Sequence, residues 1–275
     1  MTAPAVPVCA IVIPARHAST RFPGKPLTPL HGANGTARSL IERSWRAACA
    51  VPGIARVVIA TDDARIADHA ATFGANVVMT PDTCRNGTER CAATLPALAA
   101  DLGTAPDVVI NWQGDAPLAP PHTIAPLIAL LARDPALGVA TPAIPATPGV
   151  LAALRADEAA GRVGGTTVVF DARSHALYFS KRIIPHIPPE RAADPGLVHL
   201  HLGLYAYRPA ALMAYAAAAP SHLELLEGLE QLRFADLGIP VGLALIDAPA
   251  HDMIECNNPE DVPLIEAALR LAGMD

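Results

Sequence analysis

The residues between positions 14 and 30 combine cationic side chains with small hydrogen-bonding ones. Arg16, Arg21 and Lys25 stand there among serine, threonine and glycine, and the first acidic residue of the chain is Glu42. Since the chain as a whole carries a net charge of −6, this acid-free stretch predicts a local positive field. Guanidinium and ammonium groups bind phosphate oxygens strongly. The stretch therefore indicates a site for a polyanion such as a nucleotide triphosphate, rather than a plain solvated loop, although the GxxxxGK[ST] pattern of a Walker loop is absent.

A carboxylate follows a second apolar run further along the chain. Residues 107–111 read DVVIN, which predicts a strand, and WQGDAP then places Asp115 just after its carboxyl end. Parallel sheets bind ligands at that end, and Mg²⁺ prefers carboxylate, water and phosphate oxygens. An aspartate in Gly-Asp-Ala-Pro also suits an ordinary turn. Because a cationic loop and a strand-end aspartate together make one coherent metal and nucleotide site, we expect Asp115 to bind Mg²⁺.

The sequence NGTER, Asn86 to Arg90, opens a helix predicted to run through Leu98. Asn-Gly lets the backbone approach a flat ligand, and the amides of a helix start suit an anion or the polar edge of a base. The same residues suit an ordinary turn and cap, with Glu89 favourable at the helix start. The spacing alone leaves both interpretations open.

Alternating strand and helix patterns must position these residues. Residues 8–13 are almost all apolar and rich in β-branched side chains, which is typical of a strand buried on both faces of a parallel sheet. The order that follows, strand, helix, strand, helix, favours a parallel sheet with helices on both faces. Thr61, Asp62 or Asp63 is expected to cap the helix over 64–73. Beyond residue 138 the pattern predicts short strands, then one amphipathic helix over 221–234.

Composition limits the class of protein. At 275 residues without an evident linker, the chain is expected to form a single domain over 1–275. It has no apolar run near about twenty residues and no signal peptide pattern, so we expect a cytoplasmic protein that does not associate with membranes. The acidic net charge disfavours nucleic-acid binding. Five cysteines without a CxxC motif argue against disulfides and against a cysteine metal site.

Several motifs resemble, in the same order, those of the 3-deoxy-manno-octulosonate cytidylyltransferases, the CMP-Kdo synthetases. They are PARHASTRFPGKPL, NGTER, WQGDAP, ALYFSKRIIP, HLHLGLYAYR and SHLELLEGLEQLR. The resemblance covers nearly the whole chain. It implies an α/β Rossmann-like nucleotidyltransferase fold, a mostly parallel twisted sheet with helices on both faces. It also implies a homodimer, paired through a small strand-rich insert at about residues 162–215 that adds acceptor contacts.

The resemblance also implies roles for individual residues. CTP would be bound by Ala15, Arg16, Lys25, Asn86, Gly87 and Arg90. A small acidic acceptor would be bound by Arg21, Gln113, His201, Tyr205, Glu230 and Gln231. Arg16 and Lys25 on the triphosphate, and Asp115 on Mg²⁺, would be the catalytic residues.

Three positions depart from the family's pattern. Ala116 replaces the glutamate of QGDEP, Thr167 stands where a lysine is usual, and Asn257 takes the place of a second metal-binding aspartate. An asparagine can bind Mg²⁺ through its carbonyl oxygen but brings no charge. Asn257 is therefore the expected second ligand by position, while Glu255 and Asp252 remain alternatives between which the sequence does not choose.

The expected reaction is transfer of CMP from CTP to the acidic acceptor, with release of pyrophosphate. A 3-deoxy-2-keto sugar acid such as Kdo is the acceptor that we favour. A phosphonate such as phosphonoformate is the alternative, because the three departures lie in motifs near metal and acceptor while the CTP loop is intact. A catalytically inactive nucleotide-binding regulatory protein is a third possibility, in case Asn257 abolishes metal binding.

Overall fold

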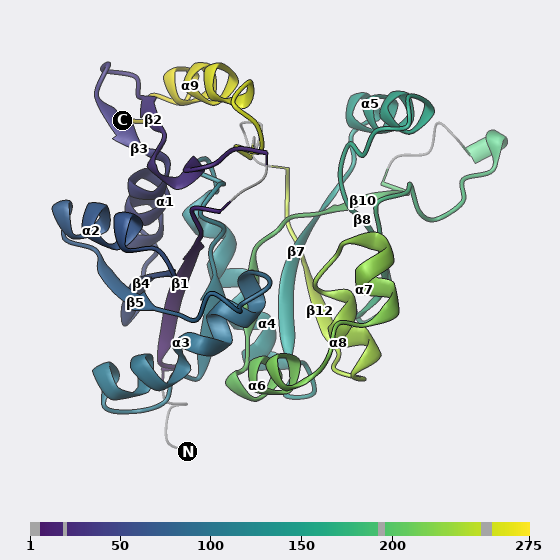
Figure 1. Cartoon of the computed structure of the whole chain (residues 1–275). Helices are drawn as coiled ribbons and strands as arrows, with labels where there is room; N and C mark the ends of the chain where they lie inside the picture. Colours follow the sequence, from purple (N-terminus) through teal and green to yellow (C-terminus); the bar gives the residue numbers. More distant parts are fainter. Residues whose placement is uncertain (1–5, 19–20, 192–195, 249–254) are drawn as a thin grey trace. The chain divides into compact units, whose positions relative to one another are not determined.

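The structure is a computed structural model that describes residues 6–18, 21–191, 196–248 and 255–275. The chain divides into two compact units (Figure 1). Met1–Ile124 and Pro249–Asp275 form the first unit, and Ala125–Ala248 form the second. The expected single domain over 1–275 stays a prediction.

Four parallel strands form the sheet of the first unit. They are β1 (Cys9–Ala15), β4 (Arg56–Thr61), β5 (Asn76–Met79) and β6 (Val108–Asn111), in the order β5-β4-β1-β6. Every residue from Ala10 to Ile13 of β1 is fully buried. Because successive side chains of a strand point to opposite faces, both faces of the sheet are covered at β1. This is the parallel α/β arrangement predicted from the sequence.

Three helices pack against this sheet, and each begins at a side-chain cap. They are α1 (Leu40–Cys49), α2 (Ala64–Thr72) and α3 (Gly87–Leu102). Ser39, Asp63 and Asn86 accept a hydrogen bond from a backbone amide in the first turn of each helix. The aspartate that caps α2 is therefore Asp63. The unit also contains the 3₁₀ turns η1 (Lys25–Leu27) and η2 (Pro121–Thr123), the hairpin β2 (Pro29–His31) and β3 (Ala37–Ser39), and the C-terminal helix α9 (Asp261–Leu271).

The second unit is built on the long strand β7 (Val139–Pro145). It pairs in parallel with β12 (Val241–Leu245), and antiparallel with β10 (His199–His201) and β11 (Tyr205–Tyr207). β10 pairs antiparallel with β8 (Thr167–Phe170), which pairs antiparallel with β9 (Ala176–Ser180). β8 to β11 lie within the strand-rich insert predicted over about residues 162–215, and they make the sheet mixed.

Helices complete the second unit. They are α4 (Ile124–Arg133), α5 (Pro148–Ala159), α6 (Pro209–Ala217), α7 (His222–Glu227) and α8 (Leu232–Asp236), with the 3₁₀ turn η3 (Pro189–Arg191). Within the described part of the chain, none of the helices has the length and apolar character needed to cross a membrane.

The single helix predicted over 221–234 is wrong, because two short helices occupy this stretch. Gly228 ends α7 in the left-handed conformation, with φ of 62°, which stops the regular helix. Leu223 and Leu226 of α7 are 40% and 69% exposed, whereas Leu232 of α8 is fully buried. After the break at Gly228, α8 buries its apolar side chains, whereas the leucines of α7 stay exposed.

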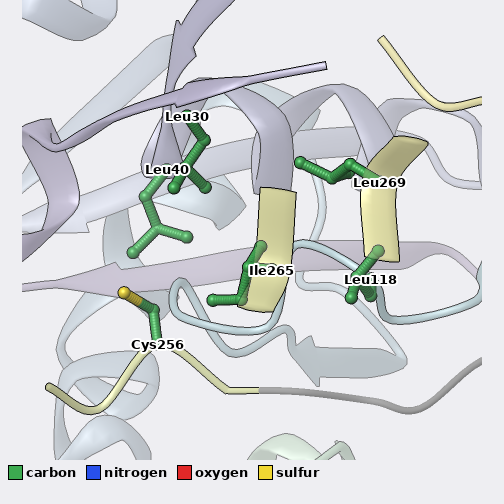
Figure 2. Packing of buried hydrophobic residues seen from close by; sticks show 6 residues of the cluster. All are labelled: Leu30, Leu40, Leu118, Cys256, Ile265 and Leu269. Carbon is green, nitrogen blue, oxygen red and sulfur yellow. The ribbon is translucent and has the colours of Figure 1, made fainter. Parts of the chain in front are cut away.

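A hydrophobic cluster joins the C-terminal segment to the rest of the first unit (Figure 2). It unites side chains from the hairpin, α1, the loop after β6 and α9, namely Leu30, Leu40, Leu118, Cys256, Ile265 and Leu269. All six are buried. Because Cys256 belongs to this cluster, the residues on either side of it are held against the loop that follows β6.

We expect Ile265→Ala to lower the free energy of unfolding by about 2–5 kcal/mol, because truncation removes buried contacts and leaves a cavity. Leu271→Ala is the matched control on the same helix, since Leu271 is 84% exposed. Its effect should stay within about 0.5 kcal/mol. Urea denaturation followed by circular dichroism measures both, and equal midpoints for the two variants would contradict the anchoring role of the cluster.

Candidate nucleotide site

Gly24 shapes the loop that follows β1. Its φ of 72° lies in the left-handed region that favours glycine, and its amide donates to the carbonyl oxygen of His17 at 3.1 Å. Lys25 then opens η1, in which Pro26 is buried. The Nζ atom of Lys25 lies 2.6 Å from Oδ2 of Asp115. The turn thus joins the predicted phosphate-binding lysine to the predicted metal-binding aspartate.

Asp115 is held by the backbone that precedes it. Gly114 passes so close to β1 that a Cβ atom there would lie 2.8 Å from the carbonyl oxygen of Pro14, so a larger residue would force the two chains apart. The hydroxyl of Ser44 on α1 donates to the Gly114 carbonyl at 3.0 Å. These contacts place Asp115 at the carboxyl edge of the parallel sheet, where such sheets bind ligands.

The segment before α9 reaches the same edge. The amide of Cys256 donates to the carbonyl oxygen of Asp115 at 2.9 Å. The side-chain amide of Asn257 donates to Oε2 of Glu255 at 3.2 Å, and its oxygen accepts from Arg21 at 3.5 Å. Asp115, Glu255 and Asn257 are therefore brought together. Asp252, the remaining candidate ligand, lies outside the described residues.

Two carboxylates and two cations meet at this edge. Desolvation of its carboxyl group and the negative charge of Asp115 raise the pKa of Glu255, although the residue as a whole is exposed. The hydrogen bond from Asn257 and the charges of Lys25 and Arg21 act in the opposite direction without cancelling the rise. The two carboxylates repel each other, and a divalent cation bound between carboxylate oxygens would relieve this repulsion.

The other residues predicted from the loop and from the end of β6 differ in exposure. Arg16 is exposed and forms no ion pair with any residue that the structure describes, so its guanidinium is available to an anionic ligand. Ala15 ends β1 and is buried, while Gln113 is half-buried on the loop before Asp115.

The start of α3 is used mainly for structure. Asn86 caps the helix, accepting from the amide of Glu89 at 2.9 Å, so the cap that the sequence left open is observed. The buried guanidinium of Arg90 donates to Thr80 at 2.5 Å and to Asp62 at 3.1 Å, which ties α3 to the residues that follow β5 and β4. A Cβ atom at Gly87 would lie 3.1 Å from the side-chain amide of Asn111, so this turn packs closely on β6. Binding of CTP by these residues stays a prediction.

Three of the predicted acceptor residues come together in the second unit. The ring of His201 lies 5.1 Å from that of Phe179 and 5.3 Å from that of Tyr205, between centroids. The hydroxyl of Tyr205 donates to Oε1 of Gln231 at 3.1 Å. Gln231 is 2% exposed, and its Nε2 has no hydrogen-bond partner among the described residues. Since buried polar groups are normally paired, this amide offers a donor to a ligand. Glu230 beside it is half-buried.

His201 is held in its neutral form. Burial lowers the pKa of its imidazole to about 3. The hydroxyl of Thr141 donates to the carbonyl oxygen of Leu204 at 2.7 Å and so accepts from Nε2 of His201 at 2.8 Å. The proton therefore resides on Nε2, and Nδ1 is left as a hydrogen-bond acceptor.

Comparison with known proteins decides the family. A model of the cytidylyltransferase family matches residues 10–239. The chain is 46% identical to the 3-deoxy-manno-octulosonate cytidylyltransferase of Maricaulis maris, over 95% of this chain and 97% of that protein. The chain belongs to the 3-deoxy-manno-octulosonate cytidylyltransferase family.

Two further comparisons agree with this assignment. The 3-deoxy-manno-octulosonate cytidylyltransferase of Syntrophotalea carbinolica is 39% identical over 94% of this chain and 97% of that protein. A solved structure of CMP:2-keto-3-deoxy-manno-octonic acid synthetase complexed with CTP is 30% identical, with a TM-score of 0.80 over 96% of this chain and 99% of that chain. The family and fold predicted from the motifs are confirmed, and the protein is an enzyme, a nucleotidyltransferase of the cytidylyltransferase type.

Two of the departures from the family pattern are explained by packing. The hydroxyl of Thr167, which replaces a usual lysine, donates to the carbonyl oxygen of Arg182 at 2.6 Å and accepts from the amide of Ile184 at 3.2 Å. It thus fixes the segment that follows β9 by local hydrogen bonds. Ala116 is buried, with 7% exposure, at a position where a glutamate would place its charge in the interior.

Stability should fall as the pH drops from about 6.5, the usual pKa of histidine, toward about 3, because the unfolded chain then binds a proton that folded His201 does not. His201→Gln keeps an amide donor for Thr141 and removes the titrating group, so the variant should lose less stability over this interval. Urea midpoints recorded between about pH 7 and about pH 4 test this. His222→Gln, at an exposed position, is the control and should keep the wild-type pH dependence. A wild-type slope in His201→Gln would show the pKa assignment to be wrong.

Proposed function

We propose that the protein transfers CMP from CTP to 3-deoxy-manno-octulosonate, Kdo, with release of pyrophosphate. The observation that carries the proposal is the meeting of Lys25 and Asp115, 2.6 Å apart, at the carboxyl edge of the sheet in a chain of this family. The relatives compared above are named for Kdo, and the solved relative is named as a complex with CTP. They favour the sugar acid over a phosphonate, and catalysis over a regulatory role.

Arg16 and Lys25 supply the positive charge for the triphosphate. Nucleotidyl transfer needs no protein nucleophile, because positioning and electrostatic stabilisation provide most of the rate. In the free protein Lys25 neutralises Asp115, and when CTP binds, its ammonium group turns to the phosphate oxygens. An oxygen of the acceptor then attacks the α phosphorus in line, and the bond to the leaving pyrophosphate breaks.

Mg²⁺ is the metal that the donor set fits. Asp115 would hold it, together with a group from the segment before α9, and phosphate and water oxygens would complete its octahedral shell. When bound, it would neutralise charge on the α phosphate. Lys25 and Arg21 flank this position and offset the charge of the remaining phosphate oxygens.

The acceptor is proposed to contact the cluster of the second unit. The unpaired Nε2 of Gln231 offers a donor to a carboxylate or hydroxyl oxygen, and the hydroxyl of Tyr205 is already held on the same amide. Neutral His201 offers Nδ1 to a hydroxyl of a sugar. These groups suit a polyhydroxylated acid better than a small phosphonate, which lacks the hydroxyls.

Pyrophosphate release with CTP, Mg²⁺ and Kdo tests the proposal. We expect turnover with CTP, little with GTP, and little with phosphonoformate in place of Kdo. Asp115→Asn should lower kcat by about a hundredfold or more, since it removes a charged group that acts in the transition state.

Asp68→Asn is the matched control for this experiment. Asp68 is exposed on α2, so its substitution should leave kcat unchanged. Wild-type protein that binds CTP yet releases no pyrophosphate with Kdo would exclude the proposed acceptor. Full activity of Asp115→Asn would exclude the proposed metal site.

We also propose a homodimer formed through residues 168–207. The support is the resemblance of this segment to the region that pairs subunits in the family, together with Leu177 of β9, which is 64% exposed. Sedimentation equilibrium should give about twice the chain mass of 28.5 kDa, and Leu177→Lys should shift the mass toward one chain. Leu271→Lys, at an exposed position outside this segment, should not. A wild-type mass near 28.5 kDa at micromolar concentration would refute the dimer.

A further inference from the structure

Asn257 stands where the family carries a second metal-binding aspartate, but its amide is engaged by protein groups. We propose that Glu255 is the second carboxylate ligand of Mg²⁺ in this chain, and that Asn257 is a positioning residue for it. The inference rests on the proposed function, because it concerns the metal that would serve CMP transfer. The observations that support it are the contacts of residues 255–258.

The backbone brings Glu255 next to Asp115. The following residue, Cys256, is fully buried and donates its amide to the Asp115 carbonyl at 2.9 Å. This hydrogen bond fixes the chain at one point, and the cluster of Figure 2 fixes the side chain of Cys256 at another. Glu255 is therefore tied to the metal-binding loop through its neighbour, while its own side chain is exposed and can reach a ligand.

The contacts of Asn257 position neighbouring groups. Its backbone amide donates to Oδ2 of Asp261 at 2.8 Å, and the amide of Asn258 donates to the same oxygen at 2.7 Å. Its side-chain nitrogen donates to Oε2 of Glu255 at 3.2 Å, and its side-chain oxygen lies 3.5 Å from the guanidinium of Arg21. An amide bridging a carboxylate and a cation in this way orients the carboxylate.

Charge favours the same assignment. Mg²⁺ binding depends on the number of anionic ligands, and an amide oxygen in place of a carboxylate removes one negative charge. Glu255 lies two positions before Asn257, and a glutamate side chain is one methylene longer than an aspartate side chain. A carboxylate supplied from this position restores the charge that Asn257 lacks.

Binding of Mn²⁺, counted by the electron paramagnetic resonance signal of the free ion, tests the assignment in the full-length protein with and without CTP. Glu255→Gln should raise the Kd for Mn²⁺ in the CTP complex by about tenfold or more, and Asn257→Ala should raise it less, since loss of a supporting group weakens a ligand without removing it. Glu260→Gln is the matched control, because Glu260 is exposed in the same segment, and it should leave the Kd unchanged.

The competing ligands give different outcomes. A wild-type Kd in Glu255→Gln would overturn the assignment, as would a larger rise in Asn257→Ala or Asp252→Asn than in Glu255→Gln. Calorimetric titration of CTP in EDTA distinguishes a wrong assignment of Glu255 from a wrong proposed function. Wild-type protein that binds neither CTP nor Mn²⁺ contradicts both proposals, whereas normal CTP binding with an unchanged Mn²⁺ Kd in Glu255→Gln contradicts only this one.

Discussion

Asp115 is bonded through both its backbone and its side chain, and the arrangement of the site depends on this. Its carbonyl oxygen accepts the amide of Cys256 at 2.9 Å, and its carboxylate lies 2.6 Å from the ammonium group of Lys25. Both side chains are largely shielded from water, so their attraction is less screened than that of a surface pair. The ammonium group of Lys25 offsets the charge of the Asp115 carboxylate.

Apolar packing holds the polar site together. The cluster around Ile265 and Cys256 fastens α9 and the residues before it onto the first unit, and Gly114 lets the loop after β6 approach β1 closely. Hydrophobic burial is strong but has little directionality, whereas the hydrogen bonds of Asp115 are directional. The first therefore supplies most of the stability, and the second sets the positions of the charged groups.

Some polar residues of the second unit form structural hydrogen bonds, and one has a polar atom without a partner among the described residues. On α7, Glu224 receives two hydrogen bonds from buried Arg233, and Glu227 accepts from Ser180 and from the amide of Lys181. Burial raises the pKa of Glu227, but these hydrogen bonds outweigh it and hold the pKa below its usual value. The carboxylates of both acids are therefore used in hydrogen bonds that hold the fold together. The amide nitrogen of Gln231 has no such partner among the described residues, and acceptor binding is therefore proposed for this residue.

Local sequence determined the parallel strands, a helix cap within residues 61–63, the cationic loop and the strand-end position of Asp115, because apolar periodicity and turn chemistry act over a few residues. The motifs determined the family. Tertiary structure decided that Lys25 faces Asp115, ninety positions away, and that Glu255 and Asn257 lie beside them. It also decided that Gly228 breaks the predicted helix over 221–234. These features depend on contacts between distant segments, and such contacts form only when the burial of side chains like Ile265 and Cys256 brings the segments together.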